Sequence, residues 1–285
     1  MSTSAGQKPG QGNAKKIVIF ILCVLLSIIS LLPFWLTFVN ASRTSEAIQS
    51  GLSMIPGSKL FENVKNVLAR PDLDIMLGFR NSLFVSTMVT VCSLLFATAT
   101  AYGLTVYQFK LKDAAFTFIM AIMMIPQQVS IIGFYRLCHN MGILNSFAAI
   151  ILPAIAAPPI AFYMRQYMKG ALSISLVEAA RIDGCNEFRT FFTISLPIMT
   201  PALATQGIMA FIQAWNNFFT PSIVLTEKTK YTLPIQIAQM KSDTFRTDYG
   251  QVYAGVFVAM LPLIVVYILL SKFIVEGVAA GGVKE

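Results

Sequence analysis

The sequence predicts an all-α integral membrane protein with six transmembrane helices and one helical loop on the cytoplasmic side. Three observations predict this fold class. Hydrophobic residues make up 56% of the 285 residues and charged residues only 12%, whereas soluble domains are about 25% charged. Mean hydropathy is +0.69. Six stretches approach the roughly 20 apolar residues that a helix needs to cross a bilayer. So few charges cannot cover a water-facing surface, which excludes a soluble enzyme.

The apolar runs define the six candidate spans. They are residues 17–39, 83–106, 114–135, 147–164, a stretch from about 201 within the uncharged run 190–226, and 253–271. The first has 23 residues, more than the roughly 7–15 apolar residues of a signal peptide, so we expect a retained anchor. Pro153 and Pro262 are tolerated because neighbouring helices satisfy the freed carbonyls. Ser93, Ala97 and Ala101 lie four apart and predict a small-residue packing face.

Loop lengths and charges predict the domain organisation. The expected parts are a cytoplasmic tail 1–16, the first transmembrane helix 17–39, an extracytoplasmic loop 40–80, a core domain 81–275 with five spans and a cytoplasmic loop 168–197, and a cytoplasmic tail 276–285. Three lysines and no acid precede the first span, while only Arg43 closely follows it. Lys110 and Lys112 lie in the next inner turn. By the positive-inside rule, both termini are cytoplasmic.

No Asp, Glu, Lys, Arg or His lies inside the six predicted spans. Ion-coupled transporters and intramembrane hydrolases need such groups at membrane depth, so the sequence disfavours both and predicts no catalytic residue. The four cysteines are far apart and His139 is the only histidine, which predicts neither a disulfide framework nor a metal site. Segment 51–59 has the wrong glycine spacing for a phosphate-binding loop. Energy for transport must therefore come from another chain, and we expect no cofactor in this one.

The spans carry neutral polar side chains instead. They are Gln127, Gln128 and Ser130 in the third span and Gln206, Gln213, Asn216 and Asn217 in the fifth. Amides donate and accept hydrogen bonds without a buried net charge, which suits a neutral, hydroxyl-rich solute. The alternative is that these amides form hydrogen bonds between helices, as Asn and Gln commonly do in membranes.

The cytoplasmic loop predicts a short helix, a turn and a second helix. Ser175 and Glu178 match a capping box, which predicts a helix start at about Leu176. Gly184 suits the left-handed residue after a helix, and Asn186 suits the cap of the next helix, which Pro197 would stop. Ala179 and Ala180 have almost no side chain and let another surface approach, and Glu178, Arg181 and Arg189 rim this surface. The alternative is an ordinary surface helix with Glu178 as a cap.

The same loop carries a longer pattern. Residues 178–197 read Glu-Ala-Ala, three residues, Gly, nine residues, Ile, one residue, Leu-Pro. This pattern resembles the signature of permease subunits of binding-protein-dependent ABC importers. The resemblance implies that the first helix is a coupling helix, which seats in a cleft of a separate ATPase subunit. The residues carried over to that role are Glu178, Ala179, Ala180, Arg181, Asp183 and Gly184.

The resemblance extends to the carbohydrate branch of these importers over roughly residues 79–285. The segments that carry it are 125–129, 164–184, 211–221, 232–234 and the tail with Gly277, Gly281, Gly282, Val283 and Lys284. The type most similar is the shorter permease of a maltose-type pair. Two departures stand out. Residues 171–175 lack the Ile-Pro that is usual before the signature, and Gly282 and Glu285 replace the usual Ala and Gly of the tail.

The resemblance implies a type I ABC importer permease fold and a function. The chain would be a non-catalytic subunit in a bacterial inner membrane, importing a sugar or oligosaccharide that an extracytoplasmic solute-binding protein delivers. Its other partners would be a second permease and two ABC ATPase subunits, which bind ATP and Mg²⁺. The implied solute path holds Gln127, Gln128, Gln213, Trp215, Asn216 and Asn217, with Trp215 either stacking on a sugar or anchoring at the interface.

Two further expectations concern the ends of the core. The tail with Gly281, Gly282, Val283 and Lys284 would reach between the ATPases, and segment 226–252 with Lys228, Lys230 and Lys241 would touch the binding protein. Two alternatives stay open: a permease for a non-sugar solute such as a polyamine or phosphate, and a standalone homo-oligomeric channel. A charged solute should leave a countercharge in the path, and a standalone channel does not explain the complete signature.

Overall fold

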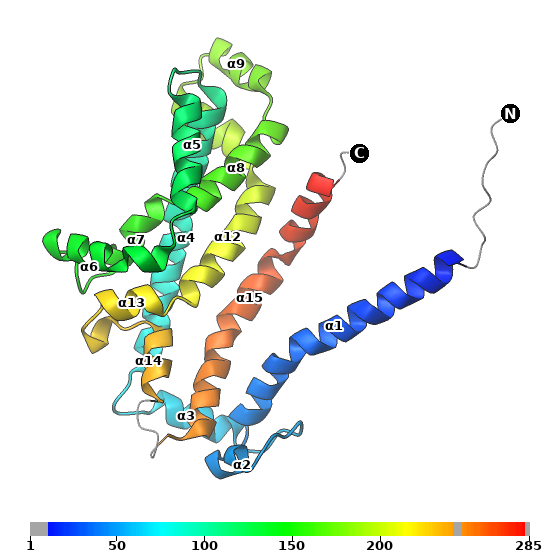
Figure 1. Cartoon of the computed structure of the whole chain (residues 1–285), viewed down its shortest axis with the longest axis vertical. Helices are drawn as coiled ribbons and strands as arrows, with labels where there is room; N and C mark the ends of the chain where they lie inside the picture. The colour runs from blue at the N-terminus through cyan, green and yellow to red at the C-terminus, as the bar shows by residue number, and fades with distance from the viewer. Residues whose placement is uncertain (1–10, 242–246, 283–285) are drawn as a thin grey trace. The chain divides into compact units, whose positions relative to one another are not determined.

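The computed structural model describes residues 11–241 and 247–282. Every regular element in this part of the chain is helical, as the sequence predicts (Figure 1). The chain divides into two compact units. The smaller comprises residues 1–69 and 243–258, and the larger comprises residues 70–242 and 259–285.

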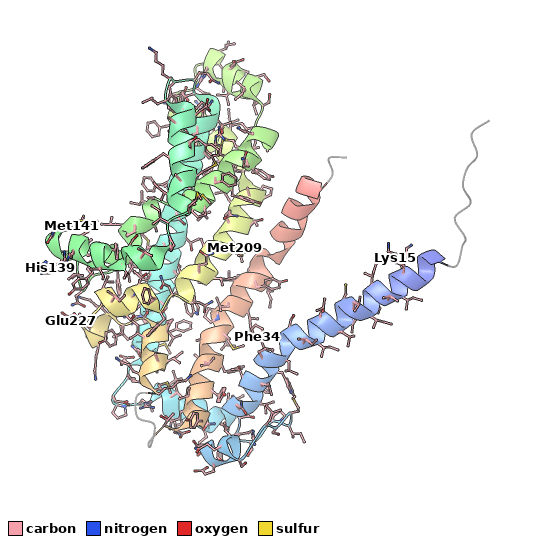
Figure 2. The ribbon with its side chains drawn as sticks, in the orientation of Figure 1. Lys15, Phe34, His139, Met141, Met209 and Glu227 are labelled. Atoms are coloured by element: carbon pink, nitrogen blue, oxygen red, sulfur yellow. The ribbon has the colours of Figure 1, made fainter. Side chains whose placement is uncertain are left out.

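The smaller unit contains the first span, α1 (Gln11–Ala41), with α2 (Ser45–Gln49), α3 (Leu60–Leu68) and the start of α15 (Tyr249–Gly282). In the apolar helix Lys15–Ala41, the 18-residue window that qualifies it as a candidate span has no buried position, and the side chains of Lys15 and Phe34 point outward in Figure 2, whereas Val39 and Ala41 at its C-terminal end are buried. Only its C-terminal end is held by other elements. The Asn63 amide donates to the carbonyl oxygens of Ala41 at 2.8 Å and Arg43 at 2.9 Å.

The larger unit is built on α4 (Ile75–Val106), against which α8 (Pro158–Ala171), α12 (Thr200–Trp215) and α14 (Leu233–Gln239) pack (Figure 1). The Asp74 carboxylate caps α4 by accepting a 2.9 Å hydrogen bond from the Leu77 amide. Ser93, Ala97 and Ala101 are buried, which confirms the predicted packing face. Small side chains let helix backbones approach closely, and a membrane offers no hydrophobic drive to replace that packing.

Four helices are long and apolar enough to cross a membrane in the described residues. They are Lys15–Ala41, Ile75–Val106, Ala148–Ala171 and Tyr249–Leu269, and the pair Glu187–Ile198 and Thr200–Trp215, bent by 79°, makes a fifth if it is one span. These correspond to the first, second, fourth, sixth and fifth predicted spans. α12 begins within one residue of the predicted start at Pro201 and forms the apolar part of the bent pair.

The third predicted span is not one continuous helix, so that prediction is wrong. The chain forms α5 (Lys112–Met123), a 3₁₀ turn η1 (Gln127–Ser130) and α6 (Ile131–Asn140). Pro126 between them lacks an N–H and disfavours helical backbone at the preceding residue. The 12 residues of α5 span only about 18 Å at 1.5 Å per residue. α5 packs against α8, and Figure 1 shows α6 running sideways, in a different direction from α5.

The fourth predicted span is longer than expected. It was predicted to end at residue 164, but α8 continues to Ala171 and places Arg165 inside a candidate span. Arg165 is only 5% exposed, and its guanidinium carbon lies 3.7 Å from the centre of the Phe116 ring. The aromatic face attracts the cation where water is excluded. The prediction that the spans carry no charge is therefore wrong at this position.

Candidate coupling site

The segment predicted to be the coupling helix is helical: it forms α9 (Ile174–Ile182), which follows α8 at the upper end of the larger unit in Figure 1. It begins two residues before the predicted start, so the expected capping box does not form. Ser173 takes the cap position with extended backbone (φ −73°, ψ 130°). Its hydroxyl lies 2.6 Å from the Ser175 hydroxyl, which is already inside the first turn. Without the usual Ile-Pro before the signature, the helix begins at Ile174 with Ser173 in the cap position and no hydrogen bond from a backbone amide to the Ser173 side chain.

The turn after α9 forms as the sequence predicts. Gly184 has φ +81°, a left-handed conformation that favours glycine. The Cys185 amide donates to the Ala180 carbonyl at 2.9 Å and the Gly184 amide to the Arg181 carbonyl at 3.1 Å, which is the bonding pattern of a Schellman motif. Asn186 then caps α10 (Glu187–Thr190), accepting a 2.8 Å hydrogen bond from the Arg189 amide. The predicted helix, turn and helix are therefore confirmed.

The second helix does not stop at Pro197. After α10 the chain continues through a π-helical turn η3 (Phe191–Ser195) and α11 (Leu196–Ile198). Pro197 lies inside the helical stretch Glu187–Ile198, directly after the π-helical turn, and does not end the helix. The direction changes by 79° before α12, so the helical loop leads directly into the fifth span.

The Glu-Ala-Ala triplet divides between two faces of α9. Glu178 and Ala179 are exposed, whereas Ala180 is buried with Val177. Val177 belongs to an apolar cluster with Tyr102, Val106 and Met168. The expectation that both alanines leave room for a partner is wrong for Ala180, since this alanine lets α9 pack on its own chain. The exposed residues Glu178, Ala179, Ile182 and Asp183 define the coupling face.

Two large apolar side chains on the loop are far more exposed than the others there. Ile182 of the coupling face is 86% exposed and Phe188 of α10 is 79% exposed. Single exposed apolar residues are common on soluble proteins, but these two lie on a short loop beyond the apolar spans, next to charged neighbours. They suit a partner surface with shallow apolar pockets.

A polar network links this loop to the end of α4. One Glu187 carboxylate oxygen accepts a 2.8 Å hydrogen bond from Nε of Arg181. The other accepts hydrogen bonds from the hydroxyls of Tyr107 at 2.5 Å and Tyr102 at 3.2 Å. The hydrogen bond from Arg181, followed by that from Tyr107, lowers the pKa of Glu187. Partial burial and the bond to Glu187 raise the pKa of Tyr107.

Sequence reasoning named only Arg181 of these four residues. The tyrosines lie 85 and 80 positions before Glu187, so no local spacing connects them. The signal that the sequence carries is only a tyrosine pair at the end of a span and a separate loop with both acidic and basic residues.

The residues of the predicted solute path lie in different surroundings. Gln213 and Asn216 are exposed on the last turn of α12, and the Asn217 side chain accepts a 3.3 Å hydrogen bond from the Thr220 amide. Trp215 is 2% exposed, stacks on Phe211 at 5.8 Å and donates from its indole to the Ala259 carbonyl at 3.0 Å. This placement favours an anchoring role for Trp215 over stacking on a sugar.

Other predicted residues are only partly covered. Gln127 and Gln128 are the first two residues of η1, and their side chains lie outside the described part of the structure. Gly281 and Gly282 end α15, while Val283 and Lys284 lie outside the described residues. A cavity of about 420 Å³ between α4, α12 and α15 is almost wholly apolar, and no residue of the predicted path lines it.

The segment after α13 (Phe219–Val224) is held to the opposite end of α4. The Asn81 amide donates to the carbonyls of Thr229 and Tyr231, each at 3.0 Å. The Ser82 hydroxyl accepts a 2.8 Å hydrogen bond from the Leu233 amide at the start of α14. These contacts and the Glu187 network lie near the two ends of one helix of 32 residues, about 48 Å long. α4 therefore joins the two ends of the larger unit.

Comparisons with known proteins place this chain in a family. The model of the binding-protein-dependent transport system inner membrane component matches residues 74–279. The arabinooligosaccharides transport system permease protein AraQ of Halalkalibacterium halodurans is 34% identical over 91% of this chain and 93% of its own length. The lactose transport system permease protein LacG of Rhizobium radiobacter is 31% identical over 94% and 96%.

A solved structure shows the same fold. It is a chain of a bacterial ABC transporter involved in the import of the acidic polysaccharide alginate, with a TM-score of 0.80 and 22% identity, covering 95% of this chain and all of that one. The type I permease fold expected from the sequence is thus confirmed. With a family model over most of the chain and relatives along nearly its full length, this protein belongs to the binding-protein-dependent transport system inner membrane component family.

Proposed function

We propose that this chain is the membrane-spanning subunit of an ATP-driven importer for a sugar or oligosaccharide. The names of AraQ and LacG, both carbohydrate permeases, support the solute class. The amides of Gln213 and Asn216 support it as well, because they can bind hydroxyl groups without bringing a charge into the membrane.

The coupling face is the observation that carries this proposal. Glu178, Ala179, Ile182 and Asp183 stand exposed on a short helix beyond the spans, inside the complete signature of residues 178–197. A permease without an ATP site needs a surface through which another subunit moves it. The small Ala179 admits close approach, and Ile182 offers an apolar side chain whose burial gains roughly 2 kcal/mol.

The two ends of the larger unit support an assignment of partners. We assign the coupling face to one of two ABC ATPase subunits, which bind ATP and Mg²⁺, and place it with both termini on the cytoplasmic side of the inner membrane. We assign the segment with Lys228 and Lys230 to a solute-binding protein on the outer side. A second permease completes the path, and residues 281–284 reach between the ATPases.

Purification from the cells that make this chain tests the proposal. A tag at residue 1 and a gentle detergent should recover a second multi-span protein and a P-loop ATPase, both identified by mass spectrometry. Recovery of this chain alone or as a homo-oligomer, under conditions that preserve a known ABC complex, contradicts the importer and favours a channel.

Substitution of the exposed apolar residues sharpens the test. Ile182→Ser and Phe188→Ser should each reduce the recovered ATPase several-fold while the chain reaches the membrane in normal amount. Phe61→Ser is the matched control, because Phe61 is 87% exposed on α3, outside the coupling loop. Equal recovery from all three variants would show that the coupling loop does not bind the ATPase.

A further inference from the structure

The coupling helix is tied to its own chain by two separate features. One is apolar: Val177 is fully buried in the cluster that contains Tyr102 of α4. The other is the Glu187 network, in which both carboxylate oxygens accept hydrogen bonds, one from Arg181 of α9 and the other from Tyr102 and Tyr107. Within the described residues, this network alone places one side chain in hydrogen-bond contact with both α9 and the end of α4.

The contacts of the network depend on distance and angle, so they resist a displacement of α9 relative to the end of α4. Hydrogen bonds to a charged carboxylate are stronger than neutral ones and depend on angle, whereas an apolar contact resists sliding only weakly. The Arg181 guanidinium carbon also lies 5.6 Å from the centre of the Tyr107 ring, and the rings of Tyr102 and Tyr107 meet edge to face at 6.0 Å. A displacement of α9 therefore pulls on the end of α4 through short, oriented contacts.

The position of α4 gives this link a consequence. α8, α12 and α14 all pack against α4, and its other end holds the segment bound by Asn81. We propose that Glu187 is a positioning residue that transmits the displacement of α9 by the ATPase to α4, and through α4 to the rest of the larger unit. This inference rests on the proposed function, since it requires an ATPase at the coupling face.

A purely structural ion pair is the competing explanation. The side chains of Arg181 and Glu187 are 37% and 42% exposed, and exposed pairs contribute little to stability because water screens them. Removal of the network should therefore leave folding and assembly nearly unchanged. Because the variants should still fold and assemble, the transmission of movement from α9 to α4 can be measured without loss of the protein.

Hydrogen–deuterium exchange of the complete transporter tests the inference without knowledge of the solute. The complex is purified with its ATPase subunits, and exchange is compared with and without ATP and vanadate in two segments, 174–185 and 98–107. In the unmodified complex, ATP and vanadate should change exchange in both. In Glu187→Gln and Tyr107→Phe, the change should persist in 174–185 and fall at least about threefold in 98–107.

Two further variants complete the design. Tyr167→Phe is the matched control, because Tyr167 packs against the same cluster and its hydroxyl has no hydrogen bond within the described residues; it should behave like the unmodified chain. The double variant Glu187→Gln with Tyr107→Phe should be no worse than Glu187→Gln alone, because both act through one contact.

The outcomes separate the two proposals. An unchanged response in 98–107, an additive double variant, or a loss of assembled complex from both single variants overturns the transmitting role of Glu187. Failure of the unmodified chain to bind an ATPase, or no change in 174–185 on adding ATP and vanadate, contradicts the importer itself.

Discussion

Replacement of Gly184 by alanine is the sharpest test of the turn that shapes the coupling face. Gly184 has φ +81°, and a Cβ added there meets no atom within 4 Å. The cost is therefore conformational and not steric. A left-handed L-residue costs about 1–2 kcal/mol, and alanine recovers about 0.4–1 kcal/mol by restricting the unfolded chain. Gly184→Ala should destabilise the turn by about 1 kcal/mol.

This change should weaken the binding of the ATPase. If the coupling face binds the ATPase only while the turn is formed, a destabilisation of the turn by about 1 kcal/mol raises the apparent Kd for the ATPase by at most about fivefold. The assay is a titration of purified ATPase subunit against this chain in lipid nanodiscs. Gly184→Asn should fall between alanine and glycine, because asparagine tolerates the left-handed conformation.

Gly142 supplies a matched control at the end of α6, which Figure 2 marks by His139 and Met141. Gly142 has φ +67° with no atom within 4 Å of an added Cβ, and its amide donates to the His139 carbonyl at 3.0 Å. Gly142→Ala should carry the same conformational cost and leave ATPase binding unchanged. Equal weakening by both variants, or none by Gly184→Ala, would refute the reasoning.

Three other predictions concern packing, the outer segment and pH. Trp215→Phe keeps the ring stack but loses the partly buried hydrogen bond to the Ala259 carbonyl, so thermal unfolding in detergent should show a loss of about 1 kcal/mol; Trp35→Phe, which loses an exposed hydrogen bond, should cost less stability, and the reverse order would contradict the argument from burial. Asn81→Ala removes two hydrogen bonds, so limited proteolysis within 226–241 should be faster; an unchanged pattern would show that α14 alone holds the segment. The folded pKa of Glu187 is lowered from 4.5, so the small stabilisation that this exposed pair contributes is complete above that pH and lost as pH falls through the folded value; the small difference in thermal stability between the unmodified chain and Glu187→Gln should shrink below pH 4.5, and a difference that stays constant would contradict the network.

Much of the site was predictable because its signals are local. A left-handed glycine after a helix and an asparagine before the next helix act within a few residues, so Gly184 and Asn186 could be assigned directly. The capping box at Ser175 failed for a related reason. Ser173 and Ser175 both offer a hydroxyl, and the sequence pattern alone cannot choose between neighbouring cap positions.

The apolar-run pattern does not predict where a proline interrupts a membrane span. Pro262 lies inside the continuous helix α15, whereas Pro126 separates α5 from η1. Both stand in uncharged apolar runs, and a local rule cannot distinguish them. A helix continues through proline only where neighbouring groups satisfy the freed carbonyls, and those neighbours belong to the tertiary structure.

The sequence by itself determined the membrane class, most of the spans, the coupling signature and the turn that ends α9. Composition, apolar run length and short-range backbone preferences carry that information along the chain. Only the tertiary structure decided that Ala180 faces inward while Ala179 faces outward, that Trp215 is buried, and that Glu187 joins two tyrosines at least 80 residues away. Such pairings depend on which helix faces meet, and the free energy of packing that selects them belongs to no single segment.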